Sequence, residues 1–182
     1  MARVSQRRIQ GFLRCGDNAQ TMTEKGRALE DLICYLFEKV PGISVTRRNR
    51  LNVFDTQEID VAFWNEKHPR GLPFLPEIIL VECKNWTQPV SGQEINWFDS
   101  KLRDRGLHFG VLIAASGITG NPAQLTSAHG TVAAALREGR RIVVITRDEM
   151  EGITDTAQIA LLVKEKLCEL VVVGTIITEI IP

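Results

Sequence analysis

The sequence predicts an α/β protein built around a mixed β-sheet that is flanked by helices. Three runs of aliphatic side chains, at residues 78–81, 109–115 and 141–146, have the length of strands. Such runs are typical of strands that are covered on both faces. Segments with helical periodicity separate these runs, and an alternating segment at residues 57–64 precedes the first of them. Strands that alternate with helices favour a sheet between helical layers.

The first helix is predicted to begin after Thr21 and to end near residue 39. Thr21 and Glu24 have the spacing of a capping box, in which the hydroxyl and the carboxylate bond free amides at a helix start. Large apolar side chains between residues 29 and 37 form its buried stripe, and Pro41 stops it.

A hairpin is expected next. A strand begins at residues 43–46, and residues 57–64 should then pair with residues 77–86 across a connection rich in proline and glycine. Side chains alternate along a strand, so Glu82 and Lys84 point to the same face. Buried charges without partners are costly, and this pair must therefore meet a cleft, another charge or a metal ion.

The next helix is predicted over residues 92–104. Ser91 and Glu94 have the spacing of a second capping box. Apolar residues of this helix face the sheet, which leaves Asp99 and Lys101 on the side expected to face solvent.

The remaining elements complete the sheet. Asn121 is expected to cap a helix that has proline at its first position. Thr154 or Asp155 caps a last helix through Leu170. The β-branched run at residues 171–181 then predicts an additional edge strand, which is also a candidate contact for a homodimer.

Composition favours one compact domain over residues 21–182, preceded by a basic arm at residues 1–20. With 44% hydrophobic residues, 182 residues can bury a sizeable core. Apolar runs fall short of the roughly 20 residues of a membrane span, and the N-terminus does not resemble a signal peptide. We therefore expect a cytoplasmic protein with no membrane partner. The four cysteines lack paired spacing, which argues against a zinc site or a disulfide framework.

Basic side chains are concentrated locally although the net charge is zero. Arg47, Arg48 and Arg50 come shortly before the segment that contains Asp60. They are candidate contacts for nucleic-acid phosphates. A solvated strand face is the alternative interpretation.

Asp60 is the expected partner of Glu82, because antiparallel pairing would bring the two carboxylates together. Carboxylates at close range repel, and a divalent cation removes the conflict. Since Mg²⁺ prefers oxygen ligands, Asp60, Glu82 and the main-chain carbonyl of Cys83 are candidate ligands for Mg²⁺ or Mn²⁺. Lys84 would orient a water or offset charge on a phosphate, and it would accept a proton if desolvation near the metal ion lowered its pKa.

This arrangement resembles the PD-(D/E)XK nuclease superfamily. The residues Val81 to Trp86 (Val-Glu-Cys-Lys-Asn-Trp), with Pro-Val-Ser at 89–91 and a following helix, are similar to the Mrr-like restriction endonuclease group. The resemblance covers roughly residues 22–148, and the proline that often precedes the first aspartate is absent here. It implies a restriction-endonuclease-like three-layer fold, DNA as the partner and metal-dependent endonuclease activity.

In that superfamily an acid of the first helix assists the metal site. Glu30, at the edge of the apolar stripe, best matches this role, and Glu24 is the alternative. The resemblance thus implies a catalytic set of Glu30, Asp60, Glu82 and Lys84.

Two other functions stay open from the residues alone. In one, Glu82 and Lys84 form a structural ion pair, and the protein is a non-catalytic nucleic-acid-binding or assembly module that keeps the fold. In the other, the same metal site cleaves RNA or a small nucleotide. Trp86 is interpreted as a lid over the edge of the core rather than as a base-stacking residue.

Overall fold

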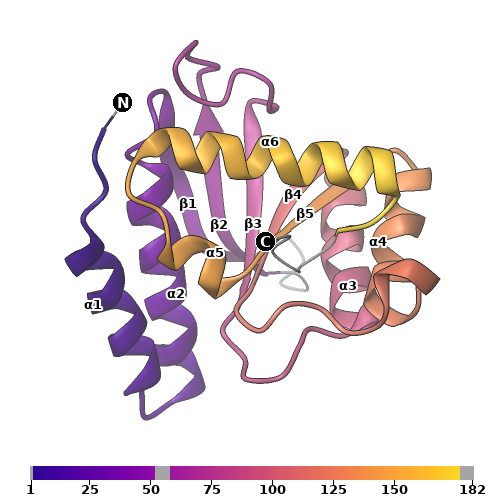
Figure 1. Ribbon diagram of the computed structural model, residues 1–182, viewed down its shortest axis with the longest axis horizontal. Coiled ribbons are helices and arrows are strands. Elements are labelled where there is room, and N and C mark those ends of the chain that lie inside the picture. The colour runs from indigo at the N-terminus through magenta and orange to yellow at the C-terminus, as the bar shows by residue number, and fades with distance from the viewer. Residues whose placement is uncertain (1, 52–57, 177–182) are drawn as a thin grey trace.

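The computed structural model describes residues 2–51 and 58–176. In this part of the chain, five strands form one sheet in the order β1-β2-β3-β4-β5. Strand β2 is antiparallel to both β1 and β3, and β3, β4 and β5 are parallel (Figure 1). The strands are β1 (Ile43–Leu51), β2 (Glu58–Asn65), β3 (Ile78–Lys84), β4 (Phe109–Ala114) and β5 (Arg141–Ile145).

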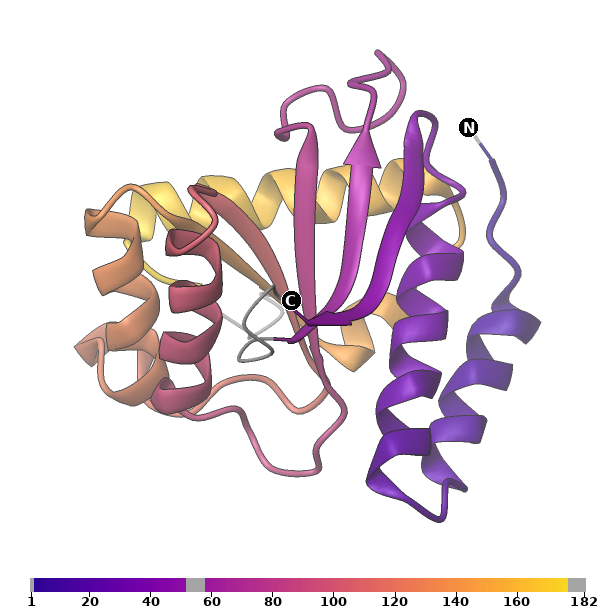
Figure 2. The ribbon, with the colours of Figure 1, turned by 180° about the vertical axis from the view of Figure 1, so that it is seen from behind.

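Helices cover both faces of the sheet, which confirms the predicted α/β fold (Figures 1 and 2). Helices α2 and α6 pack on one face, and α3 and α4 pack on the other. The helices are α1 (Gln6–Asp17), α2 (Met22–Phe37), α3 (Gly92–Arg103), the 3₁₀ turn η1 (Pro122–Gln124), α4 (Ser127–Arg137), α5 (Arg147–Glu151) and α6 (Thr156–Val173).

Strand β3 shows how the two cores set the direction of the charged residues at its end. Ile79 and Val81 are buried against the α2 side, whereas Leu80 is buried against the α3 side. Because side chains alternate, Glu82 and Lys84 continue the row of Leu80 and face α3.

The capping box of α2 is present in full. The Thr21 hydroxyl accepts a hydrogen bond from the Glu24 amide, and the Glu24 carboxylate accepts one from the Thr21 amide. Because α2 begins here, Glu30 lies two turns into the helix. Only 8% of the surface of Glu30 is exposed.

The prediction of an arm at residues 1–20 is wrong for residues 6–17, which form α1. Ile9 and Leu13, one helical turn apart, are buried. Helix α1 packs beside α2 rather than on the sheet, so a narrow apolar stripe is sufficient to hold it. Arg147, at the start of α5, forms an ion pair with Asp17 at the end of α1.

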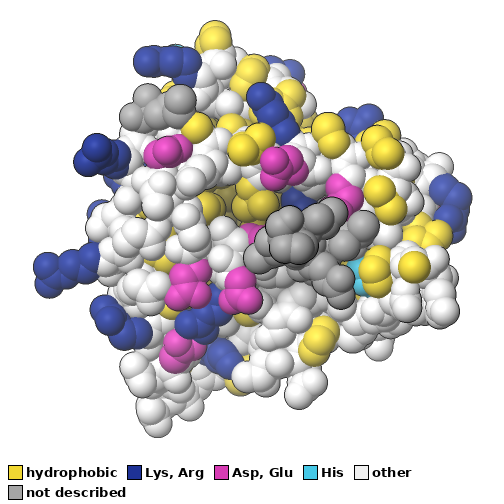
Figure 3. Space-filling model, in the orientation of Figure 1, with side chains coloured by type: hydrophobic (Ala, Val, Ile, Leu, Met, Phe, Trp, Pro, Cys, Tyr) yellow, Lys and Arg dark blue, Asp and Glu magenta, His cyan; other side chains and the backbone are white. Residues whose placement is uncertain are grey.

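The C-terminal prediction also changes. Residues 171–173 continue α6 instead of starting an edge strand, and Gly174, with φ at 87°, ends the helix. Residues 177–181 of the expected strand lie outside the described residues. Of the two predicted caps of α6, Thr154 and Asp155, the structure has Asp155. Figure 3 shows hydrophobic side chains over the face that carries α6, where Val172 is the most exposed.

The helix predicted after Asn121 begins later than expected. The Asn121 side chain accepts hydrogen bonds from two amides, but they belong to the 3₁₀ turn η1. Leu125 then adopts the left-handed conformation, and the chain turns before α4 starts at Ser127. Within the described ranges, the helices are all too short or too polar to cross a membrane.

Candidate active site

The pairing of β2 with β3 brings Asp60 to Glu82. Val61 is opposite Val81 in the last pair of the antiparallel register, so Asp60 and Glu82 are the next residues of their strands, and the charge of Glu82 acts on Asp60. Asp60 Oδ2 accepts a hydrogen bond of 2.7 Å from the Cys83 amide. Asp60 is half-buried, and Glu82 is 5% exposed. Two carboxylates therefore share the edge of a hydrophobic core.

Glu82 is held by two ammonium groups. Lys84 Nζ lies 3.1 Å from Glu82 Oε1, and Lys101 Nζ lies 2.6 Å from Glu82 Oε2. Lys84 Nζ also lies 2.9 Å from Glu94 Oε2. The four side chains form an alternating chain, Glu94–Lys84–Glu82–Lys101, and each is at most 18% exposed. Charges this well shielded interact more strongly than exposed ion pairs do.

The carboxyl group of Asp60 titrates far from its usual range. Burial, followed by the charge of Glu82, raises its pKa to about 7, although the Cys83 amide and Lys101 act in the opposite direction. Glu30 lies close enough to raise the pKa of Asp60 further. Lys101 and the Cys83 amide thus offset only part of the effect of burial and of the Glu82 charge on Asp60.

The comparison with protein families agrees with this geometry. The model of the Mrr_cat family, described as restriction endonuclease, matches residues 21–171. The chain belongs to this restriction endonuclease family. The family assignment and the mixed sheet between helices together confirm the predicted restriction-endonuclease-like fold. The match covers the elements from α2 into α6 and leaves α1 outside. No curated protein matches the chain.

Sequence reasoning missed two residues of the site in this family member, Glu94 and Lys101. The Ser91 hydroxyl accepts a hydrogen bond from the Glu94 amide, as a cap requires, but the Glu94 carboxylate contacts Lys84. Lys101 was expected to face solvent, and its side chain is 14% exposed beside Glu82. The two residues are seven positions apart, which is about two helical turns. This spacing was the available signal that both lie on one face.

Lys84 remains charged in this setting. Burial alone would lower the pKa of its ammonium group, but the charge of Glu82 and the hydrogen bond with Glu94 outweigh burial and raise it. The expectation that Lys84 accepts a proton concerns desolvation near a bound metal ion and stays a prediction. Lys84 is a fixed cation, and its ammonium lies 5.1 Å from the centre of the Trp86 ring.

Glu30 lies on the other side of Asp60 and is held by β1. Glu30 Oε2 accepts hydrogen bonds of 3.2 Å from both Arg48 and Asn49. Arg48 also lies 2.8 Å from Asp31. The Arg48 guanidinium thus faces α2, where it fixes Glu30.

The other predicted phosphate contacts are placed differently. Arg47 is exposed, and its side chain bonds the Thr46 carbonyl. The side chain of Arg50 lies outside the described residues. Arg47 therefore stays a predicted phosphate contact, whereas Arg48 lies in position to hold Glu30.

Cys83 contributes through its main chain. Its side chain packs against the α2 core, on the face opposite Glu82. Burial raises the pKa of the Cys83 thiol well above its ordinary value, so the thiol is protonated at neutral pH. Its amide holds Asp60, and its carbonyl remains the predicted metal ligand.

Proposed function

We propose that this restriction endonuclease family member is a divalent-metal-dependent DNA endonuclease. The observation that carries the proposal is the position of Asp60, which accepts a hydrogen bond from the Cys83 amide and lies within range of the Glu82 charge, with Lys84 bonded to Glu82 at the end of β3. Family membership supports DNA as the substrate. Homodimerisation and a cytoplasmic location stay predictions.

The donor set suits Mg²⁺ or Mn²⁺. Among residues 2–51 and 58–176, no three His, Cys, Asp or Glu side chains lie grouped for a metal ion. Asp60, Glu82 and the Cys83 carbonyl nevertheless supply oxygen atoms of the kind that Mg²⁺ accepts together with water and phosphate. Burial and then the charge of Glu82 raise the pKa of Asp60, and a bound cation would offset the contribution of Glu82. A bound divalent ion would lower the pKa of a water and polarise the scissile phosphate.

The side chains around this position have separate tasks. Asp60 and Glu82 would hold the cation, and Glu30 would add negative potential beside Asp60. Lys84 is fixed between Glu82 and Glu94, so its ammonium would orient the attacking water or stabilise charge on the phosphate. A preorganised cation of this kind needs no rearrangement when the charge develops.

One observation favours a second function. The chain Glu94–Lys84–Glu82–Lys101 pairs its charges without any metal ion. A non-catalytic nucleic-acid-binding or assembly module would keep such a paired structure. Cleavage assays separate the two functions.

The decisive experiment is incubation of supercoiled and linear DNA with the purified protein in Mg²⁺, Mn²⁺ or EDTA. We expect metal-dependent cleavage that Lys84→Ala reduces by about 10²–10³-fold, the usual effect of removing one preorganised donor. Lys67→Ala removes an equal charge from an exposed pair with Glu77 and serves as the control. Failure to cleave either DNA in both metals would favour the binding module, and full activity of Lys84→Ala would refute the assigned site.

Lys101 gives a prediction about metal binding. Lys101→Met keeps the aliphatic stem but frees Glu82 Oε2, so we expect Mn²⁺ to bind roughly tenfold more tightly, as loss of a competing charged hydrogen bond allows. Titration with Mn²⁺ in the absence of DNA measures this affinity.

Arg103→Met is the matched control for Lys101→Met. It removes one positive charge from the same helix, where Arg103 is exposed and pairs with Asp104. An equal gain in both variants would show a general charge effect instead of competition at Glu82.

A further inference from the structure

A pocket of about 490 Å³ opens beside the proposed active site. Its volume lies within the range of sites that hold small organic groups, roughly 300–1,000 Å³. The pocket reaches from the end of β3 to α3. Its lining residues are Glu58, Glu82, Lys84, Trp86, Glu94, Trp97, Ser100 and Lys101.

Trp97 presents a large apolar surface at this pocket. It is 54% exposed, although a tryptophan ring normally buries most of its area. Trp97 lies three residues after Glu94 and four before Lys101, so the three side chains share one face of α3. The ring therefore lies next to the two α3 residues that contact Lys84 and Glu82.

Trp86 lines the same pocket but is engaged differently. The Lys84 ammonium lies over its ring, 5.1 Å from the ring centre. This contact ties Trp86 to the charged chain. Trp97 is thus the aromatic surface of the pocket that is available to a ligand.

The charges of the pocket favour a neutral ring over a phosphate. Its lining contains three carboxylates but only two ammonium groups, and those two already contact Glu82 and Glu94. Glu58 is exposed and forms no ion pair with the described residues. Its carboxylate can accept hydrogen bonds from a base edge, and the Ser100 hydroxyl can accept or donate them.

We infer that Trp97 stacks an unpaired nucleobase next to the scissile phosphate. A base inside a duplex is covered by its neighbours, so only a nucleotide that is single-stranded or turned out of the helix can lie on an aromatic side chain. The substrate class is therefore DNA with an unpaired nucleotide, such as a single strand, a gap or a flap. This inference rests on the proposed nuclease function.

The test measures binding in EDTA, where cleavage is not required. A single-stranded oligonucleotide that carries one 2-aminopurine is compared with the same sequence in a blunt duplex. Trp97→Ala should weaken single-strand binding by roughly tenfold, as loss of one base–aromatic stack predicts, and should abolish quenching of 2-aminopurine. Duplex affinity should change by less than about twofold, and Trp97→Phe should restore most of the single-strand affinity.

Trp64→Ala is the matched control. Trp64 is also exposed, but it pairs with Ser44 and Ile78, toward the other end of β2 from Asp60. Equal losses for single strand and duplex, an unchanged affinity in Trp97→Ala, or no binding of the single strand would overturn the inference. Selective binding without cleavage in Mg²⁺ or Mn²⁺ would keep the base site and refute the nuclease. Cleavage without selective binding of the single strand would keep the nuclease function and refute the base site at Trp97.

Discussion

Asp60→Asn is expected to reduce metal-dependent DNA cleavage by more than about 10³-fold while the protein stays folded. The amide is a weaker ligand for a divalent cation than the carboxylate, and the substitution removes one of the two charges proposed to hold the ion. An asparagine oxygen can still accept the hydrogen bond that the Cys83 amide donates to Asp60. The local structure should therefore survive the loss of activity.

The same substitution should raise stability at neutral and alkaline pH in the protein without a metal ion. The pKa of Asp60 is about 7 in the folded state and 3.8 in its ordinary state. Between these values the folded protein keeps a proton that the unfolded chain releases, so the contribution of Asp60 to stability falls as the pH rises from about 4 to 7. At pH 8 this cost is at most about 4 kcal/mol, because one pKa unit corresponds to about 1.4 kcal/mol. Asp60→Asn lacks this cost.

Urea unfolding in EDTA at pH 5 and pH 8 measures the effect, with circular dichroism as the reporter of folding. Asp60→Asn should gain stability relative to the wild type mainly at pH 8. Glu77→Gln is the control, since Glu77 belongs to an exposed pair at the beginning of β3. A loss of stability at pH 8, or cleavage at the wild-type rate, would contradict the role given to Asp60.

Strands β3, β4 and β5 were predictable because each is a short apolar run with clear end signals. The side chains on both faces of β3, β4 and β5 are buried, so the sequences of these strands are continuously hydrophobic. The meeting of Asp60 with Glu82 followed from the hairpin alone. Helix α1 was missed because its stripe of Ile9 and Leu13 is narrow, and an isolated stripe of that width resembles an exposed segment.

The direction of charged side chains was harder to predict. The register of β1 shifts between Val45 and Arg47, and a bulge of one residue exchanges the faces of all residues that follow. Counting along the strand therefore could not show that Arg48 reaches Glu30. Lys101 pairs with Glu82 on β3, and Asp99 pairs with Arg140 just before β5. Helical periodicity predicts which side chains share a face of α3, but it does not predict partners on other elements.

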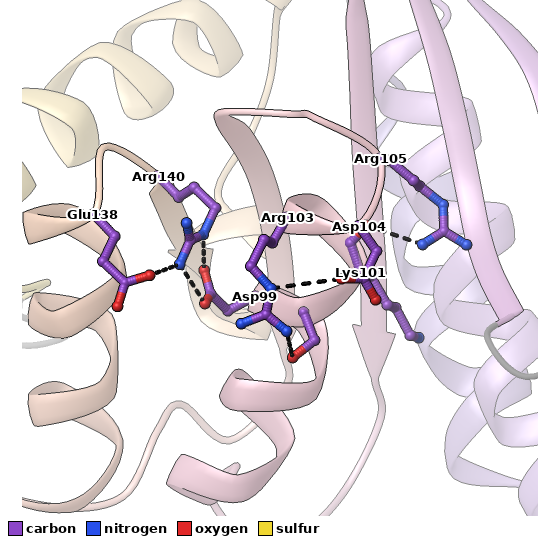
Figure 4. Close-up of polar contacts among 8 residues, drawn as sticks. Asp99, Lys101, Arg103, Asp104, Arg105, Glu138 and Arg140 are labelled. Carbon is purple, nitrogen blue, oxygen red and sulfur yellow. Dashed lines mark hydrogen bonds and ion pairs between the residues drawn. The ribbon is translucent and has the colours of Figure 1, made fainter.

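Asp99 ties α3 to Arg140, in addition to the contact that Lys101 of the same helix makes with Glu82. Asp99→Ala should lower the free energy of unfolding by about 3–5 kcal/mol. Arg140 Nε and one terminal nitrogen lie 2.6 and 2.8 Å from the two Asp99 oxygens (Figure 4). Arg140 also contacts Glu138. The hydrogen bonds with Asp99 raise the pKa of Arg140 above its ordinary value, and that ordinary value already keeps the guanidinium charged when Asp99 is removed. Arg140 would then keep only the exposed Glu138 as a charged partner, and the loss of the buried partner of its charge is the reason for the large cost.

A double variant distinguishes this explanation from simple loss of packing. Asp99→Leu combined with Arg140→Met replaces both charges by apolar side chains, and it should recover most of the stability that either single substitution loses. Urea unfolding of the wild type, both single variants and the double variant measures the coupling. Additive losses would show that the two side chains act independently. Strong coupling would mean that this ion pair anchors α3, the helix from which Lys101 reaches Glu82.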